Sequence, residues 1–144
     1  MGLPVIACTI NRYIEIKAEP NQDLLYNIKL PDIQKELIID LTQNFNFIKA
    51  EDYFHSSMDI LIKKGANFIQ GYDIVISGDI PVNAGVSSSS ALVVSWIRFL
   101  MEAQEHKKQF NDFQIGKLAY EAEVLYFNQP GGLMDQYTIA QGGM

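Results

Sequence analysis

Four consecutive serines near the middle of the chain are the residues whose type and spacing point most directly to chemistry. They lie in the sequence Pro-Val-Asn-Ala-Gly-Val-Ser-Ser-Ser-Ser-Ala, from Pro81 to Ala91, between a β-type segment and an apolar helical pattern. The first turn of a helix carries unpaired backbone N–H groups and the positive end of the helix dipole, and the hydroxyls would add further donors. Such a junction suits an anion, most commonly phosphate, and Gly85 would let it approach the backbone closely.

An ordinary helix N-cap is the competing interpretation of these serines, because serine is favoured at the start of any helix. The segment is not a Walker A loop, since it lacks the lysine of that motif and no lysine occurs between Lys64 and Lys107. The charge of a bound phosphate would therefore have to be neutralised by Mg²⁺ or by residues from elsewhere in the chain.

Two carboxylates later in the chain could complete such a site. Asp135 follows the Pro-Gly-Gly turn at 130–132, whose glycines would allow a ligand close to the backbone. A carboxylate there could act as a general base or orient a hydroxyl nucleophile. Glu123 stands twelve residues earlier, on a predicted helix. The ordinary alternatives are that Asp135 only complements a helix dipole and that Glu123 is a surface residue.

Hydrophobic patterns predict the elements that must position these residues. The predicted strands are 4–18, 24–30, 36–41 and 71–80, and the predicted helices are 50–64, 91–102, 111–127 and 133–141. Strands come first and helices follow, which indicates an α+β fold in a single domain.

Several side chains are expected in the core of this fold. Trp96 has apolar neighbours on its helix, so core packing is favoured over stacking on a base. Cys8 lies in an apolar run and is expected to be buried. The helix 111–127 is expected to turn one stripe of residues inward, consisting of Phe113, Leu118, Ala122 and Leu125.

Composition excludes several classes of function. Eleven basic and seventeen acidic residues give a net charge of −6, which argues against binding nucleic acid or an anionic membrane. One cysteine rules out an internal disulfide framework, and His55 and His106 show no metal-ligand spacing. The sequence shows neither a long apolar span nor a signal peptide, so we expect a cytoplasmic protein without nucleic-acid or membrane partners.

Three segments together resemble the GHMP kinases, a family of small-molecule kinases that includes galactokinase, homoserine kinase and mevalonate kinase. The serine loop is similar to the second signature motif of the family, and the stretch 119–136, which ends in Met-Asp-Gln, looks like the galactokinase branch. Residues 2–7 resemble the strand that follows the first motif of galactokinases. The resemblance covers essentially the whole chain. It implies a GHMP N-terminal domain of the ribosomal protein S5 domain 2 type, with a mixed sheet and helices on one face.

The resemblance also implies an activity, which is phosphorylation of a sugar by ATP with Mg²⁺, with the anomeric hydroxyl of galactose as the favoured acceptor. Asp135 would be the catalytic base, Ser89 and Glu123 would bind the metal, and Gly132 would lie against the sugar together with Asp135. The ATP phosphates would be bound by the serine loop, which comprises Gly85, Val86, Ser87, Ser88, Ser89, Ser90 and Ala91.

The chain also departs from the pattern of the family. Its first motif is expected just before Gly2, and both this motif and the C-terminal GHMP domain are absent from the 144 residues, so we expect the chain alone to be inactive and part of a longer kinase. Gly131 stands where galactokinases carry Cys, and residues 10–13 and the double glycine are similar to heptose-phosphate kinases. A heptose-phosphate kinase, a non-catalytic sugar and nucleotide sensor of the same fold, and an unrelated α+β binding module remain alternatives.

Overall fold

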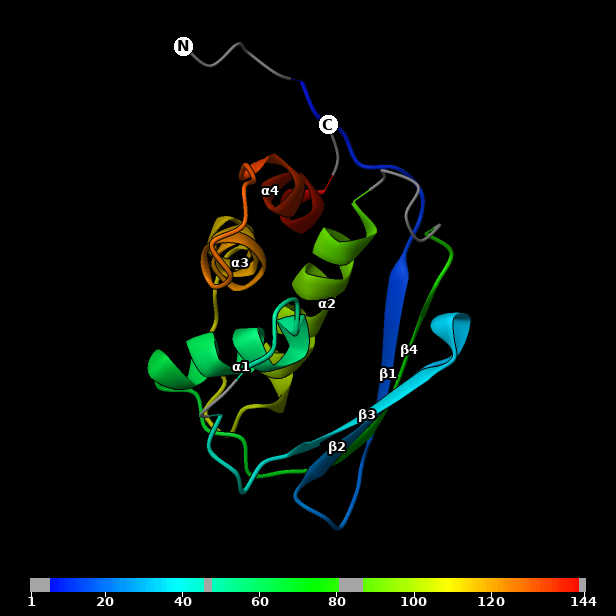
Figure 1. Cartoon of the computed structure of the whole chain (residues 1–144), viewed down its shortest axis with the longest axis vertical. Helices are drawn as coiled ribbons and strands as arrows, with labels where there is room; N and C mark the ends of the chain where they lie inside the picture. The colour runs from blue at the N-terminus through cyan, green and yellow to red at the C-terminus, as the bar shows by residue number, and fades with distance from the viewer. Residues whose placement is uncertain (1–5, 46–47, 81–86, 143–144) are drawn as a thin grey trace.

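The strands of the chain form a mixed four-stranded sheet. A computed structural model describes residues 6–45, 48–80 and 87–142. The strands β1 (Ile14–Pro20), β2 (Leu25–Leu30), β3 (Lys35–Asp40) and β4 (Tyr72–Gly78) are arranged in the order β1-β4-β2-β3. The pairs β1–β4 and β2–β3 are antiparallel, whereas β2 and β4 run parallel (Figure 1).

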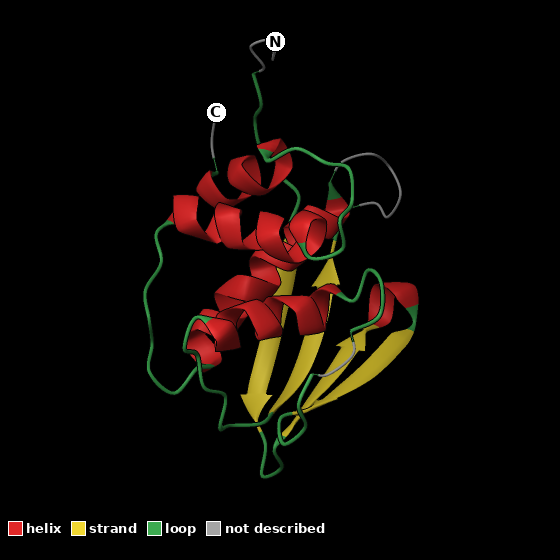
Figure 2. Cartoon of the chain, turned by 60° about the vertical axis from the view of Figure 1, so that its left-hand side comes forward, coloured by secondary structure: helices red, strands yellow, loops and turns green. Residues whose placement is uncertain are grey.

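One face of this sheet is apolar and is covered by all the helices. Alternation along the two central strands turns Tyr26, Ile28, Ile74 and Ile76 to the same buried side. On this side of the sheet lie α1 (Tyr53–Lys63), α2 (Ser88–Ala103), α3 (Asp112–Tyr120) and α4 (Met134–Gln141), as Figure 2 shows. The helix α2 packs along β1, and the other three helices pack against α2. A short π-helical turn, η2 (Glu121–Leu125), continues α3, and a 3₁₀ turn, η1 (Pro31–Ile33), joins β2 to β3. The predicted α+β fold with helices on one face is therefore confirmed.

Trp96 of α2 lies at the centre of the contact between sheet and helices. Its side chain is fully buried, and its ring meets Tyr26 of β2 and Phe54 of α1 edge to face, with centroids 6.0 and 5.0 Å apart. The indole N–H donates to the Phe54 carbonyl at 3.1 Å, which satisfies the only polar atom of the side chain. The predicted core position of Trp96 is confirmed.

The start of α1 is fixed by Asp52 as its N-cap residue. The Asp52 carboxylate accepts the His55 backbone N–H at 3.2 Å, and its second oxygen lies 2.8 Å from His55 Nδ1. Burial alone would raise the pKa of Asp52, but the hydrogen bonds from the side chain and backbone of His55 outweigh it, so the pKa lies below its ordinary value. The ionised carboxylate thus stabilises the first turn of α1.

The structure corrects the predicted first strand. Pairing of β1 with β4 begins at Ile14, opposite Gly78, where β4 ends, so the preceding residues have no strand of this sheet to pair with. Residues 6–13 therefore do not continue β1, and residues 4 and 5 of the predicted strand lie outside the described residues. Cys8, expected to be buried, is exposed for this reason.

The predicted inward stripe of the helix 111–127 is half correct. Leu118 and Ala122 are buried, but Phe113 and Leu125 are exposed. Phe113 stacks on Tyr137 of α4 at the surface, with ring centroids 4.8 Å apart. Leu125 ends the π turn, in which each turn holds more residues than in an α-helix and the helix phase therefore shifts.

Crossing a bilayer demands a longer and more apolar helix than any found in the described part of the chain.

Replacing Trp96 by Ala should lower the free energy of unfolding by about 3–5 kcal/mol, because it empties the space between sheet and helices. Urea denaturation measures the change. The matched control is Phe113→Ala, which removes an exposed aromatic ring and should cost far less. Equal losses in the two variants would contradict the central role of Trp96.

Replacing Asp52 by Ala should cost about 1 kcal/mol at neutral pH, since α1 loses its cap, whereas Asp52→Asn retains a capping oxygen and should cost less. A lowered pKa in the folded state means that the contribution of the charge is present above the ordinary pKa of 3.8 and is lost as the pH falls through the folded value. The advantage of the wild type over Asp52→Asn should therefore disappear in strong acid. Urea denaturation across the acid range tests this, and an advantage that persists there would refute it.

Candidate functional site

The serine loop and the carboxylate after the double glycine lie side by side. Ser87 immediately precedes α2 and Asp135 lies in the first turn of α4, and the Ser87 hydroxyl donates to Asp135 Oδ2 at 2.7 Å across 48 residues of sequence. The starts of these two helices therefore meet at one place in the fold.

Both residues line a cavity of about 620 Å³. Its walls are formed by the start of α2, by one side of α4 and by the chain that enters β1. Ala91 and Ser95 of α2 and Thr138 of α4 also face it. A cavity of this size, lined by apolar groups with a few convergent polar ones, is typical of a site for a small molecule.

Ser87 adopts a conformation that a simple cap would not need. Its backbone is left-handed, with φ 56°, and its side chain makes no capping hydrogen bond to α2. Left-handed backbone is uncommon outside glycine and concentrates at functional positions. The hydroxyl is directed instead at Asp135, which favours the ligand-binding interpretation of this serine over the capping one.

Arg12 brings a cation to the rim of the cavity. Its guanidinium lies 3.2 Å from Asp79, just beyond β4, and both side chains are about half exposed. The Tyr13 backbone N–H donates to the other Asp79 oxygen at 2.7 Å and is the main reason that the pKa of Asp79 is lowered. Sequence analysis did not single out Arg12 as a site residue, because it looks like one polar position in an alternating pattern.

Behind the first turn of α2, three polar side chains form a buried cluster. Glu123 Oε2 accepts the Ser90 hydroxyl at 2.8 Å and the Gln136 side-chain N–H at 2.7 Å, and all three residues are buried. The two donors replace water around the carboxylate. Glu123 is therefore not the surface residue that the alternative expected, although it does not itself line the cavity. Gln136 also belongs to this cluster, although the sequence indicated it only as the last residue of the Met-Asp-Gln motif.

The two residues predicted to hold a metal differ in exposure, since Ser89 is exposed and Glu123 is buried. Ser89 is exposed, and its neighbour Ser90, about 100° further round α2, is the serine that contacts Glu123. The described residues contain no group of three His, Cys, Asp or Glu side chains that could hold a metal alone. The chemistry of the cluster nevertheless suits Mg²⁺, since hydroxyl and carboxylate oxygens are hard ligands. Beside them the buried Gln136 Oε1 accepts no hydrogen bond from the described residues, so it is a further oxygen that could accept one from a hydrated ion.

The remaining predicted residues are partly accessible. Ser88 is half-buried and Ala91 is buried with one side on the cavity. Gly132, predicted to lie against a sugar, has open space where a side chain would be, so a ligand can approach its backbone. Gly85 and Val86 lie outside the described residues.

Comparison with known proteins gives a family match. Residues 48–143 match the GHMP kinases N terminal domain, and this range contains the serine loop, Glu123 and Asp135. A galactokinase of Lacticaseibacillus casei is 26% identical over 148 residues, which cover 98% of this chain and 37% of that protein. A galactokinase of Clostridium perfringens is 32% identical over 103 residues, covering 65% of this chain and 25% of that protein. The chain thus spans only about a third of the length of these relatives.

Solved structures show the same fold. Galactokinase of Lactococcus lactis, complexed with galactose, superimposes with a TM-score of 0.79 at 20% identity, over 94% of this chain and 35% of that one. A D-glycero-D-manno-heptose 1-phosphate kinase of Bacteroides thetaiotaomicron gives 0.76 at 25% identity, over 94% and 44%. Mevalonate kinase of Methanococcus jannaschii gives 0.74 at 22% identity, over 90% and 43%.

The family match spans most of the chain, and the sheet with its one-sided helices agrees with these structures. The chain therefore belongs to the GHMP kinase family and carries the N-terminal domain of that family.

Proposed function

We propose that this chain forms the ATP-binding part of a kinase that phosphorylates a sugar hydroxyl, with galactose as the first candidate acceptor. The observation that carries the proposal is the contact of Ser87 with Asp135 on a single cavity, because it joins a predicted phosphate site to a predicted base. The galactokinase relatives support the choice of acceptor. Since the chain spans 37% of the Lacticaseibacillus relative, the activity is proposed for a protein of that full length.

Asp135 would act on the acceptor. Its carboxylate already accepts a hydroxyl hydrogen bond from Ser87 at 2.7 Å, so it can accept one from a sugar hydroxyl in the same position. That hydrogen bond would orient the hydroxyl oxygen toward the γ-phosphorus of ATP. The Asp135 carboxylate would take up the hydroxyl proton as the new P–O bond forms and the bond to ADP breaks. Open space at Gly132, in the turn before α4, would let a sugar approach the backbone there.

The first turn of α2 would receive the phosphates of ATP. Its backbone N–H groups and the hydroxyls of Ser88 and Ser89 would donate where negative charge accumulates, with Gly85 and Val86 in the same predicted loop. The Ser87 and Ser90 hydroxyls donate to Asp135 and Glu123 and would line the same loop. Ser89 and Glu123, the latter directly or through a water, would hold Mg²⁺, which would supply the positive charge that neutralises the phosphates. The bonds from Ser90 and Gln136 would keep the Glu123 carboxylate in place.

A sugar phosphate is the second candidate acceptor. This chain is 25% identical in sequence to the heptose kinase structure and 20% identical to the galactokinase structure, over the same share of the chain. Arg12 on the cavity is a cation that could pair with the phosphate of such an acceptor. Galactose remains the first candidate because the curated relatives are galactokinases. A test of acceptors should therefore include both sugars and sugar phosphates.

In the full-length protein, Asp135→Ala should lower kcat by roughly 10²–10⁴-fold, because the acceptor hydroxyl loses its base. Binding of ATP should be retained. Phosphate transfer to galactose, other hexoses and heptose phosphates measures the effect, with calorimetry for ATP. The matched control is Asp112→Ala, an exposed aspartate at the start of α3, which should leave kcat unchanged. Transfer that survives in Asp135→Ala would exclude Asp135 as the base, and a wild type that binds sugar and ATP without transfer would identify a sensor.

Replacing Glu123 by Gln should weaken ATP binding only when Mg²⁺ is present. The amide keeps the size and an acceptor oxygen for Ser90 but removes the charge that would hold the metal. Mg²⁺ should increase the affinity for ATP at least about tenfold less in the variant than in the wild type. Calorimetry with and without Mg²⁺ measures it, and Glu102→Gln, on the exposed end of α2, is the control. An unchanged response to Mg²⁺ would remove Glu123 from the metal site.

A further inference from the structure

The segment that carries Glu123 departs from regular α-helix. In η2 the Tyr126 backbone N–H reaches back five residues to the Glu121 carbonyl, at 2.9 Å. In an α-helix the same N–H would bond to the Ala122 carbonyl. The π turn therefore releases the Ala122 carbonyl from its usual partner, and Ala122 is fully buried.

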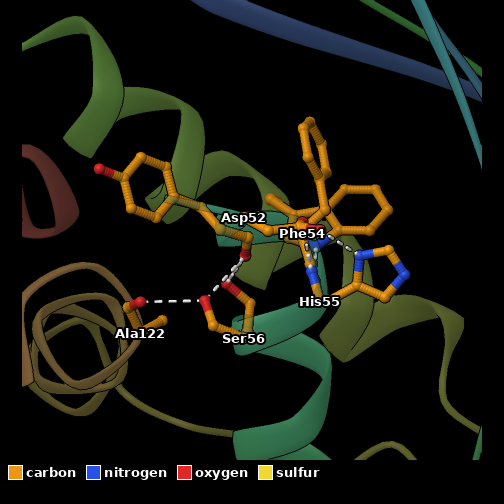
Figure 3. Close-up of polar contacts among 8 residues, drawn as sticks. Asp52, Phe54, His55, Ser56 and Ala122 are labelled. Carbon is orange, nitrogen blue, oxygen red and sulfur yellow. Dashed lines mark hydrogen bonds and ion pairs between the residues drawn. The ribbon is translucent and has the colours of Figure 1, made fainter. Parts of the chain in front are cut away.

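Ser56 of α1 supplies the missing donor. Its hydroxyl lies 2.9 Å from the Ala122 carbonyl oxygen, 66 residues away in sequence, and Ser56 itself has an exposed fraction of 0%. Figure 3 shows the Ser56 side chain directed across the gap between the two helices at this carbonyl. A contact to the Tyr53 carbonyl of its own helix is longer, at 3.3 Å. Because a buried carbonyl without a donor is costly, this bond stabilises the π turn relative to regular helix.

Two further contacts, from α1 and the residue after it, are made near the two ends of the same turn. Lys64, just beyond α1, pairs with Glu121 at 3.2 Å, and the Tyr126 hydroxyl donates to Asp59 at 2.7 Å. Both contacts are more accessible to water than the one made by Ser56, and the accessible Lys64–Glu121 ion pair contributes little. Ser56 is thus the buried anchor among the three, and it acts on the residue next to Glu123.

We propose that Ser56 is a positioning residue, whose hydroxyl holds the π turn in the phase that presents Glu123 to Ser90 and Gln136. None of the residues of α1 lines the cavity, so α1 sets the position of the carboxylate from outside the site. The effect on nucleotide binding rests on the function proposed above. The effect on the shape of η2 does not depend on it.

The experiment compares Ser56→Ala with Ser57→Ala in the full-length protein. Ser57 is an equally buried neighbour whose hydroxyl bonds at 2.7 Å to the Tyr53 carbonyl of its own helix, so its loss leaves η2 untouched. Amide hydrogen exchange of residues 121–127 reports the turn, and calorimetry of ATP with and without Mg²⁺ reports the site. Ser56→Cys, which fills a similar space with a weaker donor, should lie between Ser56→Ala and the wild type.

We expect Ser56→Ala to accelerate exchange in 121–127 and to reduce the tightening of ATP by Mg²⁺ about tenfold, with metal-free ATP binding unchanged. Ser57→Ala should do neither. Equal effects of the two variants, or unaltered exchange in Ser56→Ala, would overturn the proposal. A third outcome separates the two proposals. If Ser56→Ala exchanges faster and Ser57→Ala does not, the role of Ser56 in η2 is supported. If the wild type then binds no ATP with Mg²⁺, the proposed kinase function is refuted.

Discussion

A buried carboxylate is the group on which the geometry of the site depends. Glu123 has an exposed fraction of 7%, and removing a charged group from water is costly unless donors replace the water. Ser90 and Gln136 supply those donors at 2.8 and 2.7 Å. Because the three side chains come from α2, η2 and α4, one charge fixes the placement of three helical segments relative to one another. Ser87, directly before α2, and Asp135 of α4 meet at the same two helix starts, so the contact between them is consistent with this placement.

The one-sided sheet determines where this site can form. Every helix of the described residues lies on the same side of the sheet, and Trp96 joins α2 to both β2 and α1. The first turns of α2 and α4 are thereby brought together at the end of the sheet where the chain enters β1. The starts of two helices and the entering chain then enclose a cavity, while the apolar residues of α2 beyond its first turn pack in the core. The separation allows the cavity to hold polar groups without weakening the packing.

Local patterns predicted much of the fold and part of the site. The strands β2, β3 and β4 and the helices α1, α2 and α4 lie within a few residues of their predicted bounds, since alternation and helical periodicity are properties of neighbouring residues. The predicted helix 111–127 is divided into α3 and the π turn η2. The hydroxyl-rich loop and Asp135 could be named from residue types alone. Local patterns could not show that Cys8 is exposed, because that depends on where β4 ends, nor that Ser90 rather than Ser89 meets Glu123, because that depends on the phase of α2 against its neighbours.

The amino-acid sequence by itself established the family, the order of the elements and the residues able to do chemistry, because motifs and periodicity are written in consecutive residues. It contained no sign of the π turn that carries Glu123. That turn needs a donor for the Ala122 carbonyl, and the donor is a serine 66 residues away on another helix. A helix with an unsatisfied buried carbonyl would return to regular α-geometry, so only the packing of α1 against this segment determines the phase of the helix and the direction of its carboxylate.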